Sequence, residues 1–124
     1  MSVVLDASAL LAYLNQEAGA EEVAGQMVGG INAVNLAEVY SKVTEWGLDA
    51  HLLEQTLVRQ GLLGLEVVPF GPQDVQLVAT LQPLTKALGD WVCLALAMRL
   101  GLPAVTTDSA WNHLEAGVEV RVVR

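Results

Sequence analysis

Four acidic residues occupy places where a chain of alternating strands and helices would bring side chains together. They are Asp6, Glu38, Asp90 and Asp108. Two follow apolar runs typical of strands, and two lie at the start of predicted helices. In an open α/β sheet, ligands bind beyond the carboxyl ends of the strands. Four carboxylates gathered there would repel one another unless cations were bound. Oxygen ligands favour Mg²⁺ or Mn²⁺ over zinc, and two such ions can activate a water and stabilise the leaving oxygen of a phosphodiester.

Each of these acids also has an ordinary structural explanation. Asp6 suits the N-cap of a helix, and Asn35 and Glu38 have the i, i+3 spacing of a capping box. Asp90 and Asp108 each stand at a predicted helix N-terminus, where negative charge is favourable. Spacing alone therefore leaves catalytic and structural carboxylates as open alternatives.

The elements that must position these acids alternate between strands and helices. Apolar runs predict strands over 3–5, 31–34, 65–68 and 103–106, and period-two alternation predicts an edge strand over 118–122. Helices are predicted over 6–14, 20–28, 35–46, 49–61, 72–81 and 91–100, with a short helical turn at 108–111. Gly29-Gly30 is interpreted as the stop of the second helix. This alternation indicates the α/β class, with a parallel sheet of about four to five strands covered on both faces.

The composition limits the class of protein. Hydrophobic residues make up 53% and charged residues 16%, which excludes a disordered chain, and 124 residues predict a single domain over 1–124. The net charge of −8 argues against an extended basic surface that grips duplex DNA. No stretch reaches the ~18 apolar residues of a membrane span, and no basic leader opens the chain. We therefore expect a cytoplasmic protein without a membrane partner, whose lone Cys93 is an unreactive core thiol.

Four segments together carry a family resemblance. They are VVLDASALLA at 3–12, NLAEV at 35–39, LGDWVCLALA at 88–97 and VTTDSAW at 105–111. In this order they resemble the motifs of PIN-domain ribonucleases, and more narrowly those of VapC-type toxins of bacterial toxin–antitoxin pairs. Each motif is weak alone, but the four in order cover nearly the whole chain.

The resemblance implies a three-layer α/β/α PIN fold with a mainly parallel central sheet. It also implies a toxin that is a metal-dependent endoribonuclease, with Mg²⁺ as the cofactor and Mn²⁺ able to replace it. The family's catalytic and metal-binding acids carry over onto Asp6, Glu38, Asp90 and Asp108, and its accompanying hydroxyls onto Ser8 and Thr106. The implied partners are the RNA substrate, a cognate antitoxin whose tail enters the active-site groove, and a second copy in a homodimer.

Trp91 departs from the family's pattern, because the position after Asp90 is often arginine in these toxins. Trp91 either stacks on a base or packs against a neighbouring helix, and we favour packing. The few basic residues are Lys42, Arg59, Lys86, Arg99, Arg121 and Arg124. They predict weak affinity for generic RNA and a shallow salt dependence. Two alternatives stay open: a PIN-fold nuclease acting on another nucleic acid, and a non-catalytic binding module of the same fold.

Overall fold

A five-stranded parallel sheet forms the centre of the computed structural model, which describes residues 1–25, 29–55, 64–85 and 87–123. The sheet order is β3-β2-β1-β4-β5, and each neighbouring pair is parallel. The strands are β1 (Val3–Leu5), β2 (Gly29–Asn32), β3 (Glu66–Val68), β4 (Ala104–Thr106) and β5 (Val120–Val122). The predicted α/β class and parallel sheet are confirmed, and β5 lies at one edge of the sheet as expected.

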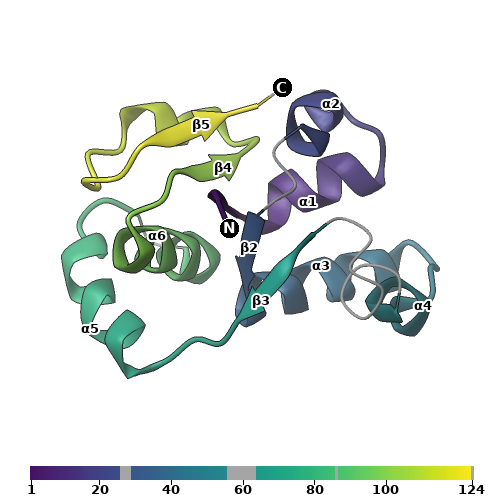
Figure 1. Ribbon diagram of the computed structural model, residues 1–124, viewed down its shortest axis with the longest axis horizontal. Helices are drawn as coiled ribbons and strands as arrows, with labels where there is room; N and C mark the ends of the chain where they lie inside the picture. Colours follow the sequence, from purple (N-terminus) through teal and green to yellow (C-terminus); the bar gives the residue numbers. More distant parts are fainter. Residues whose placement is uncertain (26–28, 56–63, 86, 124) are drawn as a thin grey trace.

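Helices cover both faces of this sheet, which gives the predicted three layers. They are α1 (Ala7–Leu14), α2 (Ala20–Ala24), α3 (Ala33–Glu45), α4 (Ala50–Glu54), α5 (Pro72–Leu81), α6 (Leu88–Leu100) and the short 3-10 helix η2 (Ser109–His113). In Figure 1, α5 and α6 lie on one side of the sheet, and α1 to α4 lie on the other. None of the helices in the described ranges is long and apolar enough to cross a membrane.

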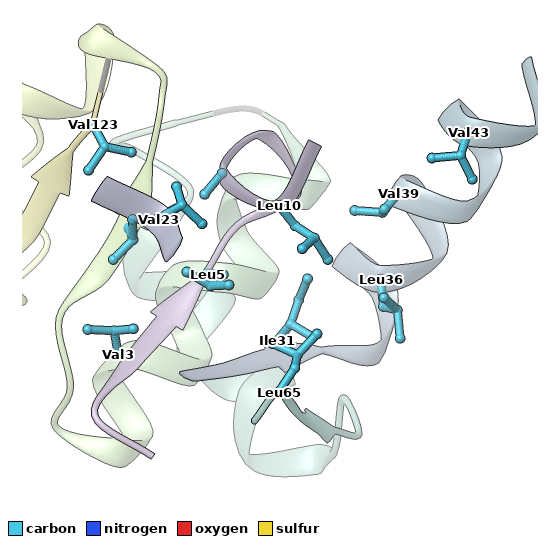
Figure 2. Packing of buried hydrophobic residues seen from close by; sticks show 12 residues of the cluster. Val3, Leu5, Leu10, Val23, Ile31, Leu36, Val39, Val43, Leu65 and Val123 are labelled. Carbon is cyan, nitrogen blue, oxygen red and sulfur yellow. The ribbon is translucent and has the colours of Figure 1, made fainter. Parts of the chain in front are cut away.

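The alternation of side chains along β1 divides the core between the two faces. Val3 and Leu5 belong to a cluster with α1, α2 and α3, whereas Val4 belongs to a cluster with α6 and η2. Figure 2 shows Leu10 of α1 and Val39 of α3 pointing toward each other within the first cluster. All five of these side chains are 2% exposed or less, so apolar burial fixes β1 between the layers.

The second strand and the helix after it begin earlier than the sequence pattern predicts. β2 covers Gly29–Asn32, so Gly29-Gly30, interpreted above as a helix stop, belongs to a strand. A Cβ at Gly30 would collide with the side chain of Met1, so glycine permits this close approach. Asn32 is the N-cap of α3, because its Oδ1 accepts a hydrogen bond from the N–H of Val34 at 2.8 Å. The capping-box interpretation of Asn35 and Glu38 is therefore wrong.

Two predicted helices extend beyond what the structure describes. α2 ends at Ala24 with Gly25 as its C-cap, and the rest of the prediction, 26–28, lies outside the described residues. α4 begins after Asp49, whose carboxylate caps it as predicted. The predicted continuation over 56–61 also lies outside the described residues.

Candidate active site

A pocket of about 180 Å³ brings the four predicted acids together. It is lined by Asp6, Ala7, Ser8, Asn35, Glu38, Gly89, Asp90 and Asp108. The pocket lies beyond the carboxyl ends of β1 and β4, where strand order reverses because β1 pairs with β2 on one side and β4 on the other. Topology therefore collects residues that are about a hundred positions apart in the chain.

Asp6 is the most deeply placed of the four acids. It directly follows β1 and is the N-cap of α1, and its side chain is 7% exposed. Its Oδ1 accepts hydrogen bonds from the N–H of Ala9 at 2.9 Å and the hydroxyl of Ser8 at 2.6 Å. Its Oδ2 accepts one from the hydroxyl of Thr106 at 2.7 Å. Capping and pocket-lining are therefore not alternatives here, because one carboxylate does both.

Ser8 and Thr106, the two predicted supporting hydroxyls, hold Asp6 in the same way. Each hydroxyl donates to one carboxylate oxygen of Asp6. Each also accepts a backbone N–H at 3.0 Å, Ser8 from Thr107 and Thr106 from Asp108. A hydroxyl has one proton, so the backbone donors orient both protons toward Asp6. The loop after β4 thus fixes the side chain that follows β1.

Burial raises the pKa of Asp6 from its ordinary value of 3.8 to about 6. Desolvation is the largest cause, and the negative charge of Asp90 raises the pKa further. The hydrogen bonds from Ser8, Thr106 and Ala9 act in the opposite direction and lower it. Burial therefore makes the negative charge of Asp6 unfavourable.

Glu38 reaches the pocket from the second turn of α3, one turn further along the helix than the sequence pattern placed it. Its Oε1 accepts a hydrogen bond at 2.8 Å from Nδ2 of Asn35, which also donates to the carbonyl of Gly89 at 3.1 Å. Asn35 is 1% exposed and so ties α3 to the start of α6. A Cβ at Gly89 would lie 2.7 Å from Oε1 of Glu38, so only glycine leaves room for this carboxylate.

Asp90 lies in the first turn of α6 and receives its hydrogen bond from the connection between α5 and α6. The hydroxyl of Thr85 donates to Oδ2 of Asp90 at 2.7 Å. The indole Nε1 of Trp91 donates to the carbonyl of Thr85 at 2.7 Å, and the Trp91 ring packs against the core cluster around α6. The packing interpretation of Trp91 agrees with these contacts.

Asp108 lies at the start of the short helix η2. It caps η2, because its Oδ1 accepts a hydrogen bond from the N–H of Ala110 at 3.0 Å, and it is exposed. The exposure of the four acids therefore increases from the buried Asp6 through the half-buried Asp90 to the exposed Glu38 and Asp108.

Two residues that the sequence did not identify as part of the site donate hydrogen bonds to its acids. Asn35 was visible three positions before Glu38, but its spacing suggested a helix cap instead of a side-chain partner. Thr85 stands in a connection without periodicity, and no local signal links it to Asp90. Both contacts are local in sequence, and only the bond from Asn35 to the carbonyl of Gly89 joins separate helices.

The donor set of the pocket fits a hard divalent cation, because its acidic side chains offer only oxygen atoms. Within the described ranges, no three carboxylate, imidazole or thiol groups stand close enough to hold a metal ion in their present positions. The two exposed acids can turn toward the buried one, and the raised pKa of Asp6 indicates that added positive charge would be favourable. None of the described lining residues is basic.

Each lysine and arginine side chain in the described residues forms a salt bridge with an acid outside the acidic pocket. Arg99 binds the fully buried Asp74, with 2.8 Å between Nε and Oδ1. Lys42 pairs with Glu45 at 3.1 Å and Arg121 with Glu119 at 2.9 Å. The other three basic residues, Arg59, Lys86 and Arg124, lie outside the described residues.

A separate apolar pocket of about 270 Å³ lies between α1, α3 and α4. It is lined by Leu14, Val43, Leu48, Asp49, Leu52 and Leu53. The carboxylate of Asp49 already caps α4, so the described part of this pocket offers no group for acid–base or metal chemistry. The acidic pocket is the better candidate for an active site, although it is smaller.

Comparison with solved structures finds the same fold in proteins of distant sequence. VapBC2 from Rickettsia felis, bound to a DNA fragment from its promoter, matches with a TM-score of 0.72 and 14% identity over 100% of both chains. FitAcB from Neisseria gonorrhoeae matches with a TM-score of 0.70 and 18% identity over 96% of each chain. DNA-bound VapBC from Salmonella typhimurium matches with a TM-score of 0.68 and 18% identity, over 97% of this chain and 96% of that one. At these identities the likeness shows the fold alone.

Sequence comparison gives the family directly. No curated protein sequence is a significant match to the chain. The family model of the PIN domain matches residues 3–117, and this span contains all four acids that line the pocket. The protein therefore belongs to the PIN-domain family, a family of nucleases that generally bind divalent metals.

Proposed function

We propose that this protein is a metal-dependent endoribonuclease and the toxin of a toxin–antitoxin pair. One observation carries the proposal: four carboxylates from separate segments line a single pocket at the switch point of the sheet, without a basic residue among its described lining. Helix capping accounts for Asp6 and Asp108, but Glu38 and Asp90 cap no helix and still line the same pocket. Converging carboxylates are the arrangement that cation-assisted phosphodiester hydrolysis requires.

Asp6, Glu38, Asp90 and Asp108 would hold Mg²⁺, which Mn²⁺ can replace. When bound, the metal supplies an activated water and stabilises the leaving oxygen of the phosphodiester. Asp6 provides the fixed point, because three hydrogen bonds hold its carboxylate. Glu38 and Asp108 lie at the exposed rim, where a phosphate of the substrate can approach them.

The proposed toxin acts in the cytoplasm as a homodimer and binds an antitoxin, and the solved neighbours support the antitoxin partner. They include a toxin–antitoxin complex from Klebsiella pneumoniae, which matches with a TM-score of 0.69 and 17% identity over 96% of this chain and 95% of that one. Exposed apolar side chains also favour a protein partner. Trp46 is 41%, Leu48 59% and Leu52 61% exposed, and all three lie around the end of α3 and the start of α4.

The proposal is tested by cleavage of total bacterial RNA with mapping of new 5′ ends. The wild type is compared with Asp90→Asn and with Glu66→Gln, each in Mg²⁺, in Mn²⁺ and in EDTA. Glu66→Gln is the matched control, because Glu66 opens β3 at the opposite end of the sheet from the pocket. We expect new ends from the wild type and Glu66→Gln with metal, and none from Asp90→Asn or with EDTA.

A parallel incubation with single- and double-stranded DNA separates the alternatives. Cleavage of DNA alone would replace the RNA substrate by another nucleic acid. No cleavage of either polymer by folded, antitoxin-free protein would favour a non-catalytic binding module.

A further inference from the structure

We propose that Trp91 is a positioning residue for the pocket and acts through Thr85 on the carboxylate of Asp90. Trp91 stands directly after Asp90 in α6. Consecutive residues of a helix do not face each other, so its indole cannot support Asp90 directly. The indole instead reaches the connection before α6, and this connection reaches back to Asp90. The inference rests on the proposed function, because it assigns a role at that same site.

Thr85 is fixed at three of its atoms. Its N–H donates to the carbonyl of Leu81 at the end of α5, at 3.2 Å. Its carbonyl accepts from Nε1 of Trp91 at 2.7 Å. Its hydroxyl donates to Oδ2 of Asp90 at 2.7 Å. Because Leu81 is 0% exposed, the first of these bonds anchors Thr85 to the core.

The consequence of these bonds is a defined direction for the Asp90 carboxylate. Oδ2 is held by Thr85, while Oδ1 accepts no hydrogen bond from the described residues and stays available to a ligand. Without the indole bond, the carbonyl of Thr85 would lose its partner from α6, and the Thr85 hydroxyl would be anchored only through Leu81. Carboxylates that bind metals depend on such hydrogen bonds for their orientation.

Tryptophan suits this position because it combines packing with a single donor. Its ring packs against the core cluster of α6, and its N–H needs a hydrogen-bond partner in a half-buried place. Phenylalanine would keep most of the packing and lose the donor. Trp91 would therefore contribute to the site through one hydrogen bond that can be removed selectively.

The first test measures Mn²⁺ affinity by calorimetry, which needs no substrate. Thr85→Val removes the hydroxyl at nearly constant volume, and Thr85→Ser keeps it. We expect Thr85→Val to weaken Mn²⁺ binding about tenfold, Trp91→Phe to weaken it by a smaller factor, and Thr85→Ser to bind like the wild type. Trp46→Phe is the matched control, because Trp46 is exposed at the end of α3. In the nuclease assay, Thr85→Val should need more Mg²⁺ for half-maximal rate and recover most of its rate at saturating Mg²⁺.

The second test uses the indole itself as a reporter in the folded wild type. The chain has three tryptophans, so a ¹H–¹⁵N spectrum resolves three indole N–H signals that Trp→Phe variants assign. Titration with Mg²⁺ should shift the Trp91 signal and leave that of Trp46 unchanged. In Thr85→Val the shift should shrink, although valine keeps the carbonyl that accepts the indole hydrogen bond.

The outcomes separate this inference from the proposed function. If Thr85→Val is folded and binds Mn²⁺ like the wild type, or if Mg²⁺ shifts the Ser8 amide but not the Trp91 indole, Trp91 and Thr85 have only a structural role and the inference is wrong. The nuclease proposal would survive that result. If the wild type neither binds Mn²⁺ at millimolar concentration nor cuts RNA, both are overturned.

Discussion

The acidic pocket has two sides that are built by different means. On the strand side, Asp6 is buried and receives three hydrogen bonds from Ser8, Ala9 and Thr106. On the helix side, Glu38 and Asp90 are more exposed, and each receives one side-chain hydrogen bond, from Asn35 and Thr85 respectively. The sheet fixes the first side through paired strand ends. The second side depends on how α3 and the α5–α6 connection meet the start of α6.

The two sides of the pocket therefore differ in how unfavourable a negative charge is and in how firmly the carboxylates are held. Desolvation of Asp6 raises its pKa to about 6, so the strand side is rigid but unfavourable for a negative charge. The helix side keeps its carboxylates in contact with water and has more freedom to move. A cation bound in the pocket would offset the unfavourable charge of Asp6 on the strand side. It would also restrict the movement of the carboxylates on the helix side. Each side should therefore respond differently to substitution.

The largest expected effect is the loss of nuclease activity in Asp6→Asn. Asparagine preserves the acceptor for Ala9 and Ser8, and its amide can donate to Thr106, so the geometry of the strand side survives while its charge disappears. Because metal-assisted stabilisation supplies several kcal/mol of the barrier reduction, we expect a fall of at least about a thousandfold in kcat/KM. RNA cleavage in Mg²⁺ measures it, with Glu66→Gln as the control. Activity within tenfold of the wild type would remove Asp6 from the site.

The same substitution should stabilise the metal-free fold, which would show the electrostatic cost directly. The folded pKa of Asp6 lies above its ordinary value of 3.8, so the native state binds the proton more tightly than the unfolded chain. The contribution of Asp6 to the free energy of unfolding therefore falls as pH rises from about 4 to about 6, by about 3 kcal/mol in total. We expect Asp6→Asn to be more stable than the wild type by up to that amount at pH 7, and by little below pH 4.

Urea unfolding in EDTA at pH 4 and pH 7 measures this difference. Glu38→Gln serves as the helix-side comparison, because Glu38 is exposed and should change stability little at either pH. A wild type that is more stable than Asp6→Asn at pH 7 in EDTA would contradict a buried, costly charge on the strand side.

The contrast between the two sides also explains what the sequence could predict. Asp6 follows β1 directly, and Ser8 lies two residues further on, so strand and cap signals place them correctly. The parallel sheet and the convergence of strand ends then follow from the alternation of elements. The contacts of the strand side are thus local in sequence, apart from the hydrogen bond between Thr106 and Asp6.

The helix side could not be read from sequence in the same way. Asn35 and Glu38 are three residues apart, and both a capping box and a side-chain pair fit that spacing. The structure distinguishes them, because Asn32 is the N-cap of α3 and Asn35 is therefore not. Gly89 meets Glu38 only where α6 packs against α3, and Thr85 reaches Asp90 through the conformation of the connection before α6. Periodicity carries no information about such contacts, because the first depends on the relative placement of two helices and the second on a connection without a repeating pattern.

Gly89→Ala should damage the helix side without removing any functional group. A Cβ there would lie 2.7 Å from Oε1 of Glu38, and the exposed Glu38 side chain can move away at small cost in stability. The displaced carboxylate should weaken Mn²⁺ binding and RNA cleavage by about 10- to 100-fold. Gly71→Ala is the matched control, because a Cβ at Gly71 meets no atom within 4 Å. Equal activity of the two variants would show that the position of Glu38 is unimportant.

The smallest effect we expect concerns the attraction of RNA, and it too should distinguish the two sides. Lys42 lines a hollow along α3 that shares Glu38 with the acidic pocket, whereas no basic residue belongs to the described lining of the pocket itself. A single-stranded RNA entering along α3 would therefore meet one cation, already paired with Glu45. In an Asp90→Asn background, Lys42→Gln should reduce the slope of log affinity against log salt by at most about 0.7. Arg121→Gln, on the edge strand β5, should leave the slope unchanged. Fluorescence anisotropy with a labelled oligonucleotide measures both variants. A steep slope that neither substitution alters would mean that RNA is held by a surface other than the helix side of the pocket.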